Sequence, residues 1–266
     1  MAKLKAVLFD LDDTLMPEME PEREALLVVC GLAAEKYGTD PEAMSDTVGE
    51  AAEKLWAQWR SPALYSSIAY SGREGLWGPS DLPDDGLGND QKTIDKYKRD
   101  AWDEVLSAHG IVDTALRDQI IVRHREERVS RLVPYDGAEK VVERVKADYP
   151  LAIVTNGSPA VQRLKLERSG LAGHFSVFVA SGDVGVGKPD PKPFLAALKS
   201  LDVSPAESVM IGNSWNSDIQ GAVNLGIPSI WYNPDREQQP SHGTPPTLEI
   251  ASLSEVPGAI RRIASG

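Results

Sequence analysis

The chain has 266 residues, which is enough to bury a sizeable core as one large domain or as two of modest size. Its formal net charge of −12, from 28 basic and 40 acidic residues, argues against nucleic acid or an anionic membrane as a partner, although local cations could still hold a small anionic substrate. The single cysteine, Cys30, excludes an intrachain disulfide and a zinc cluster of cysteines, and no apolar run reaches the roughly 18 residues of a membrane helix, so we expect a cytoplasmic protein.

Near the start of the chain, a short apolar run from Ala6 to Phe9 ends abruptly in acidic residues. The run predicts a buried parallel strand, with Asp10 just past its carboxyl end, where open α/β sheets bind ligands. If the chain stays extended for one more step, the carboxylates of Asp10 and Asp12 point to the same side, which a divalent cation or a shared proton would make tolerable. Taken alone, Asp10, Asp12 and Asp13 could instead cap a helix or line a turn.

Residues 16–134 have a helical pattern without strands, which predicts an α-helical insertion between the first strand and the rest of a sheet. A glycine- and proline-rich stretch from Ser71 to Asp90 interrupts it and predicts a long irregular loop. From this loop Arg73 and Trp77 could reach a substrate, or Trp77 could lie beneath a surface loop without any role in binding. The helices expected here are Pro21 to Tyr37, Pro41 to Arg60, Lys92 to His109 and Asp113 to Ser130.

From Gly137 onward strands and helices alternate, which is the pattern of a parallel sheet with helices on both faces. We therefore expect an α/β fold, a Rossmann-like doubly wound parallel sheet formed by residues 1–15 and 135–266. The polar stretch from Asn233 to Thr247 should be irregular. The strands expected are Leu151 to Val154, Val177 to Val179, Val209 to Ile211, Pro228 to Trp231 and Leu248 to Ile250, and the helices are Ala138 to Asp148, Pro159 to Ser169, Pro191 to Ser200, Ser217 to Leu225 and Glu255 to Ile263.

The second strand is followed by Thr155, Asn156 and Gly157, and then by a serine and a proline suited to begin a helix. Free backbone N–H groups and the positive end of the helix dipole would make this strand tip an anion site. Ser158 is the expected N-cap. The segment could also be no more than a turn between a strand and a helix.

Two further segments with candidate site residues follow later strands. Lys188 lies between Gly187 and Pro189, just before a helix that Asp190 is expected to cap, and local structure gives no reason for a lysine there other than an exposed position. Asn213 and Asp218 follow the strand that ends at Ile211. Their oxygens are ligands that a hard divalent cation accepts.

The segment Asp10-Leu11-Asp12-Asp13-Thr14-Leu15 resembles the first motif of the haloacid dehalogenase (HAD) superfamily in its phosphatase form, and the three later segments resemble its second, third and fourth motifs. The resemblance implies that Asp10 is the nucleophile and Asp12 the general acid/base. It also implies a helical cap at residues 16–134 inserted into a HAD core. Thr155, Asn156, Gly157 and Lys188 would bind the phosphate, Thr155 and Lys188 would also be catalytic, and Mg²⁺ would be held by Asp10, Asp12, Asn213 and Asp218. The family usually has an acid where this chain has Asn213, which predicts weaker metal binding.

The resemblance thus implies a Mg²⁺-dependent phosphomonoester hydrolase that acts on a small phosphorylated metabolite through an aspartyl phosphate. No nucleic-acid or membrane partner is expected, and the protein should be a monomer or a homodimer. One alternative is a 2-haloacid dehalogenase, against which Asp12 counts because halide release needs no acid at that position. The other is a catalytically weak protein that binds a phosphorylated ligand, which Asn213 favours.

Overall fold

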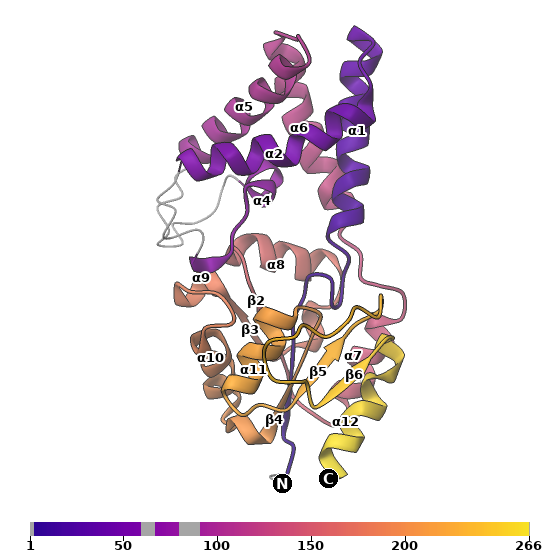
Figure 1. The fold of residues 1–266 in the computed structure, drawn as a ribbon, viewed down its shortest axis with the longest axis vertical. Helices are drawn as coiled ribbons and strands as arrows, with labels where there is room; N and C mark the ends of the chain where they lie inside the picture. Colours follow the sequence, from indigo (N-terminus) through magenta and orange to yellow (C-terminus); the bar gives the residue numbers. More distant parts are fainter. Residues whose placement is uncertain (1–2, 60–66, 80–90, 266) are drawn as a thin grey trace. The chain divides into compact units, whose positions relative to one another are not determined.

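The computed structural model describes residues 3–59, 67–79 and 91–265. The chain divides into two compact units (Figure 1). One unit, here called the sheet unit, combines Met1–Pro17 with Val133–Gly266, and the other, the helical unit, is Glu18–Leu132. Within the described part of the chain, no helix is long and apolar enough to cross a membrane.

The sheet unit contains six parallel strands in the order β3-β2-β1-β4-β5-β6, which confirms the predicted α/β fold. The strand order reverses at β1, whose neighbours are β2 on one side and β4 on the other, so the point where ligands bind in such sheets lies at the end of the first strand. The strands are β1 (Ala6–Phe9), β2 (Leu151–Thr155), β3 (Val177–Ala180), β4 (Ser208–Gly212), β5 (Ser229–Tyr232) and β6 (Leu248–Ile250).

The strand register brings three strand tips together. Phe9 of β1 pairs with Ile153 of β2 and with Ile211 of β4, so the residues that follow these three positions meet at one edge of the sheet. The N–H of Asp10 still donates to the carbonyl of Ile211, which extends the pairing one residue past β1. All four residues of β1 are fully buried, because a parallel strand is covered on both faces.

Helices cover both faces of the sheet. Leu8 of β1 packs in one core cluster with Phe194 and Ala222, so α10 and α11 cover that face. Connections between parallel strands are right-handed, and the reversal of strand order therefore puts α7 on the opposite face, where it packs against α12. The helices are α7 (Ala138–Lys146), α8 (Pro159–Arg168), α9 (Ser181–Val184), α10 (Pro191–Leu201), α11 (Gln220–Asn224) and α12 (Val256–Ser265).

Two details of this unit differ from the sequence prediction. The helix expected from Ser217 begins as a π-helical turn, Trp215–Ile219, and becomes α-helical only in α11. Ser214 is its N-cap and accepts a hydrogen bond from the N–H of Ser217. The short helix α9 was not predicted, because only four residues form it.

The helical unit contains α1 (Met19–Tyr37), α2 (Pro41–Trp59), α4 (Gly72–Trp77), α5 (Gln91–Ala108) and α6 (Thr114–Ser130). The four long helices match the predicted ones to within two residues at each end. Gly38 ends α1 with a left-handed φ of 71°, and Asp113 caps α6 by accepting from the N–H groups of Ala115 and Leu116.

The prediction of an irregular loop is wrong for its first part, since α4 occupies it. Ser71 and Glu74 form a capping box that begins this helix. Its glycines serve close packing, because a Cβ on Gly72 would lie 2.7 Å from the carbonyl oxygen of Ala52. Trp77 is fully buried and therefore cannot reach a substrate from a mobile loop. Residues 80–90 of the predicted loop lie outside the described residues.

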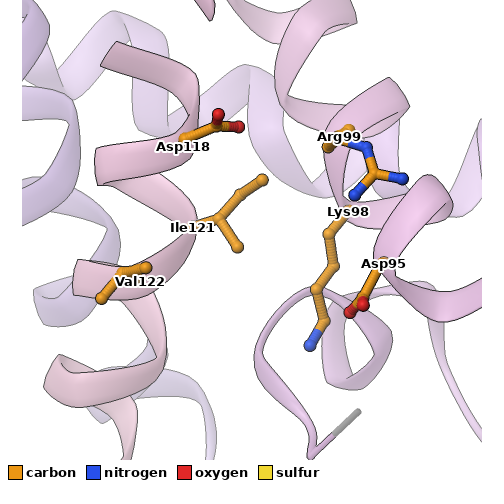
Figure 2. A pocket seen from close by; sticks show the side chains of 6 residues that line it. All are labelled: Asp95, Lys98, Arg99, Asp118, Ile121 and Val122. Atoms are coloured by element: carbon orange, nitrogen blue, oxygen red, sulfur yellow. The ribbon is translucent and has the colours of Figure 1, made fainter. Parts of the chain in front are cut away.

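A cavity of about 210 Å³ opens between α5 and α6 (Figure 2). Its walls carry both signs of charge beside aliphatic side chains, and the ammonium group of Lys98 donates to the carbonyl of Gly78 at 2.7 Å. The lysine therefore serves the fold of the helical unit. The lining residues are Asp95, Lys98, Arg99, Asp118, Ile121 and Val122.

Candidate active site

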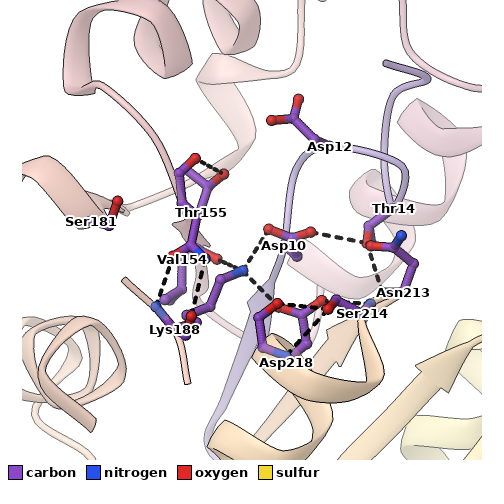
Figure 3. A network of polar contacts seen from close by, with 12 residues as sticks. Asp10, Asp12, Thr14, Val154, Thr155, Ser181, Lys188, Asn213, Ser214 and Asp218 are labelled. Carbon is purple, nitrogen blue, oxygen red and sulfur yellow. Dashed lines mark hydrogen bonds and ion pairs between the residues drawn. The ribbon is translucent and has the colours of Figure 1, made fainter. Parts of the chain in front are cut away.

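A polar network joins the tips of β1, β2 and β4, which are neighbours in the sheet (Figure 3). Its centre is the ammonium group of Lys188, which lies 2.6 Å from Asp10 Oδ1, 2.6 Å from Asp218 Oδ1 and 2.7 Å from the carbonyl of Val154. All three donors of the ammonium therefore have an acceptor. The structure brings together Asp10, Lys188 and Asp218, which are far apart in the sequence.

Burial and charge compete at this centre. Asp10, Lys188 and Asp218 are each at most 7% exposed. Burial, together with the charge of Asp218, raises the pKa of Asp10 to about 6, although Lys188 opposes the shift. Burial alone would lower the pKa of Lys188, but the two carboxylates more than offset it and raise that pKa, so the lysine is held as a cation.

The place of Lys188 is fixed by Asn156 at the tip of β2. The amide oxygen of Asn156 accepts from the N–H of Lys188 at 2.8 Å, and its amide nitrogen donates to the carbonyl of the same residue at 3.2 Å. The side-chain amide of Asn156 therefore aligns the lysine. The prediction that Asn156 donates to a phosphate then falls on its backbone N–H.

Asp218 is anchored on both of its oxygens. Oδ1 accepts from Lys188, and Oδ2 accepts from the N–H of Ser214 at 2.9 Å. A Cβ added to Gly212 would collide with this carboxyl group, so only a glycine at the end of β4 leaves room for it. Asp218 therefore holds the ammonium group of Lys188 in place.

A second part of the network joins Asp10 to Asn213 through Thr14. Thr14 Oγ1 lies 3.4 Å from Asp10 Oδ2 and 3.1 Å from Asn213 Oδ1, and it accepts from the N–H of Asn213 at 3.0 Å. A hydroxyl group has one hydrogen, so it can satisfy only one of these two oxygens at a time. The surplus of oxygen acceptors is what a hard divalent cation requires, and Asp10 and Asn213 fit Mg²⁺ in donor type.

The carboxylate of Asp12 contacts α8 and not Lys188. Its Oδ2 accepts from Gln162 Nε2 and from Lys165 Nζ, both at 3.0 Å and both on α8. Figure 3 shows its carboxylate directed away from the carboxylate of Asp10. The side chain of Asp12 therefore lies apart from the oxygens around Thr14. Its role as a metal ligand stays a prediction.

The loop that is predicted to bind phosphate follows β2. Thr155 is 1% exposed, and its Oγ1 lies 3.4 Å from the carbonyl of Asn156. The N–H of Gly157, expected to bind phosphate, donates to Ser181 Oγ at 2.8 Å. Ser158 is the N-cap of α8 as predicted, but its hydroxyl forms no capping hydrogen bond.

Four contributors were missed by sequence reasoning: Thr14, Gln162, Lys165 and Ser181. For two of them the sequence holds a signal. Gln162 and Lys165 are three residues apart and share a helix face with Leu166, which is buried. A lysine on a buried face needs an acceptor, which predicts a carboxylate partner. Ser181 offers no such signal, since its role comes from a contact across the sheet.

Comparison with known proteins identifies the family of the chain. A family model described as haloacid dehalogenase-like hydrolase matches residues 4–226. The phosphoserine phosphatase of Thermus thermophilus is 33% identical over 254 residues, which cover 95% of this chain and 98% of that protein.

Two solved structures share the fold. A 2-haloacid dehalogenase from Pseudomonas syringae superposes with a TM-score of 0.64 at 26% identity, over 97% of this chain and 99% of that one. The HAD-hydrolase YfnB from Bacillus subtilis, solved bound to magnesium, superposes with a TM-score of 0.65 at 22% identity, again over 97% and 99% of the two chains. The likeness to YfnB concerns the fold alone.

Proposed function

The chain belongs to the haloacid dehalogenase-like hydrolases, and from that premise we propose that it is a Mg²⁺-dependent phosphatase of a small phosphorylated metabolite, with Asp10 as its nucleophile. The observation that carries the proposal is the environment of Asp10. Its buried carboxylate lies at the strand-order reversal, with one oxygen on Lys188 and the other beside Thr14. Such a site keeps a carboxylate ready as a nucleophile and places positive charge where phosphoryl oxygens would lie.

In the proposed reaction, the carboxylate of Asp10 attacks phosphorus in line with the leaving oxygen. The phosphorus–oxygen bond to the leaving group breaks, an aspartyl phosphate forms, and Asp12 gives its proton to the leaving oxygen. A water molecule then gives a proton to Asp12 and attacks the phosphorus, and the bond between the phosphorus and the Asp10 oxygen breaks. Inorganic phosphate leaves, and Asp10 is restored as a carboxylate.

Lys188 stabilises the charge that develops on the phosphoryl oxygens. Monoester hydrolysis is among the slowest uncatalysed reactions, with accelerations approaching about 10²¹, so concentrated positive charge is the main requirement. The ammonium of Lys188 is aligned by Asp218 and by the Asn156 amide, which keeps it beside Asp10. Thr155 and the backbone N–H of Asn156 would add neutral donors at the tip of β2.

Asp10 and Asn213 would hold Mg²⁺ through their side-chain oxygens, and the ion would supply charge stabilisation for the phosphoryl group. Asp12 and Asp218, also predicted as ligands, each direct one carboxylate oxygen to a lysine and have no hydrogen bond to Thr14 among the described residues. We therefore assign Asp12 to proton transfer and Asp218 to the support of Lys188.

The rival reaction is halide release from a 2-halo acid, which the structural likeness to a dehalogenase makes worth testing. Asp12 weighs against it, because displacement of halide needs no proton donor. In this structure the carboxylate of Asp12 accepts from two buried side chains, Gln162 and Lys165. Burying a lysine and an amide costs free energy, so their presence beside Asp12 supports a role for that residue.

The test is phosphate release from a panel of small phosphomonoesters with Mg²⁺ and with EDTA, for the wild type and for Asp10→Asn. The wild type should turn over at least one substrate only with Mg²⁺. The amide of Asp10→Asn cannot form an acyl phosphate, so its turnover should fall to background while hydrogen exchange of β1 stays unchanged. Near-normal activity of Asp10→Asn would refute the covalent mechanism, and halide release from a 2-halo acid without phosphatase activity would establish the rival.

A further inference from the structure

Helix α8 holds Asp12 by one of its two carboxylate oxygens. Gln162 Nε2 and Lys165 Nζ converge on Oδ2, each at 3.0 Å. The other oxygen, Oδ1, is buried and has no hydrogen-bond partner among the described residues. Oδ2 of Asp12 is therefore fixed by two donors, and Oδ1 accepts no hydrogen bond from the described residues.

The two donors are built into the sheet unit. Gln162 is 1% exposed and Lys165 is fully buried, so neither side chain is a surface group that happens to reach an acid. They lie three residues apart, on the same face of α8. A lysine is rarely buried in full unless it is paired, and among the described residues Lys165 pairs with the carboxylate of Asp12.

The same helix also supports the phosphate loop. A Cβ on Gly157 would lie 2.8 Å from Gln162 Nε2, and the φ of Gly157 is 121°, which only glycine adopts without strain. Gln162 thus packs beneath the loop that follows β2 while it bonds to Asp12. The acid and the phosphate loop are positioned by one rigid element.

We propose that Gln162 and Lys165 are positioning residues that fix the orientation of Asp12, so that its Oδ1 faces the leaving oxygen of the substrate. The inference rests on the proposed function, because it assigns the partners of its general acid. An aspartate side chain turns about two bonds, and two donors on one oxygen remove that freedom before the substrate arrives. The proton still moves from Asp12 to the leaving oxygen as the phosphorus–oxygen bond breaks.

This role predicts an effect that depends on the leaving group. An alkyl phosphate releases an alkoxide, which needs a proton, whereas p-nitrophenyl phosphate releases a stable phenolate, which does not. Lys165→Met and Gln162→Met keep an unbranched side chain but remove the donor. We expect each to lower kcat/KM for glycerol phosphate by roughly 100-fold and kcat/KM for p-nitrophenyl phosphate by less than about threefold.

The matched control is Arg163→Met on the same helix, whose side chain is 51% exposed and lies 3.5 Å from Asp183. It should change neither value. Equal losses for both substrates, or no loss for either, would overturn the positioning role, since a merely structural or phosphate-binding lysine affects both. If Lys165→Met fails to fold, Gln162→Met applies the same test without removing a charge.

Crystal structures of the wild type and Lys165→Met separate this inference from the proposed function. The wild type should show Asp12 Oδ2 on both donors, and the variant should show the carboxylate turned away. An Asp12 side chain in the same place in both would overturn the inference whether or not the protein is a phosphatase. Absence of phosphate release by the wild type, with the Asp12 shift present, would instead refute the proposed function alone.

Discussion

The buried ion pair of the helical unit gives a sharp test of its stability. Glu22 on α1 is 3% exposed, and its Oε2 lies 2.7 Å from Nε of Arg128, which is fully buried on α6. Arg128 also pairs with Glu18 at 2.9 Å and lies over the ring of Trp77 at 4.9 Å. Glu22→Gln keeps the shape of the side chain and removes its charge.

The expected loss is large because Arg128 remains buried. Removing one partner of a buried pair typically costs about 3 to 5 kcal/mol, since the other charge is left without compensation. Glu18 keeps part of that compensation, so we expect about 3 kcal/mol. Glu24→Gln on the same helix is the control, because Glu24 is exposed and its pair with Arg131, at 3.2 Å, should be worth at most about 1 kcal/mol.

The loss should also depend on pH. Burial raises the pKa of Glu22, but the ring of His124, 3.6 Å away, and the positive charges of Arg128 and Arg73 more than offset it, so the pKa lies below the ordinary value of 4.5. A group whose pKa is lowered by folding stabilises the folded state fully above its unfolded pKa, and this contribution is lost as the pH falls through the folded pKa. The difference between wild type and Glu22→Gln should therefore be constant near neutral pH and shrink in acid.

Hydrogen exchange of peptides from α1 and α6 measures the opening free energy of this unit without the assumption that the whole chain unfolds in one step. Glu22→Gln should expose both helices far more often than Glu24→Gln does. The reasoning is refuted if the two variants lose the same stability, or if the effect of Glu22→Gln grows as the pH falls.

Three further predictions concern the site and the helical unit. Gly212→Ala should cost about 1 to 3 kcal/mol and most of the phosphatase activity, because the new Cβ would collide with Asp218, whereas Gly173→Ala, with no atom within 4 Å, should change neither. In a Mg²⁺ titration of activity at one ionic strength, Asn213→Asp should lower the Mg²⁺ concentration at half-maximal activity, and Asp218→Asn should lower the maximal rate. If that concentration changes only in Asp218→Asn, Asp218 is the ligand. Trp77→Ala should destabilise the helical unit by about 3 to 5 kcal/mol in hydrogen exchange, and a silent substitution would show that Trp77 does not stabilise this unit.

Much of the fold could be predicted because its signals are local. The apolar run from Ala6 to Phe9 is a strand in the structure, and the helix expected to end at Tyr37 ends there. The prediction for the stretch from Gly72 to Trp77 was wrong because its signal is not local. Its glycines predicted a loop, but they are selected by close contacts with α2, which is distant in the sequence.

The site was predictable in its residues and less so in their contacts. Asp10, Lys188 and Asp218 were expected to share one site, and they do. The reciprocal hydrogen bonds between Asn156 and Lys188 depend on the separation of two loops, which no spacing in the sequence specifies. The same holds for the contact of α8 with Asp12, because a helix face identifies a buried lysine but not its partner.

The charge balance of the site gives a reason for Asn213. Among the described residues of this network, the three carboxylates of Asp10, Asp12 and Asp218 face two lysines, Lys188 and Lys165, which leaves one formal negative charge. A divalent cation would turn this to one positive charge, which favours a phosphate dianion. A carboxylate at position 213 would bind the cation more tightly but cancel that surplus, and two like charges on the order of 6 Å apart repel by about 3 kcal/mol at an effective dielectric constant of 20. As a ligand of the proposed Mg²⁺, Asn213 would give up metal affinity and gain attraction of the substrate. Asn213→Asp should then raise KM for the phosphomonoester as it lowers the requirement for Mg²⁺.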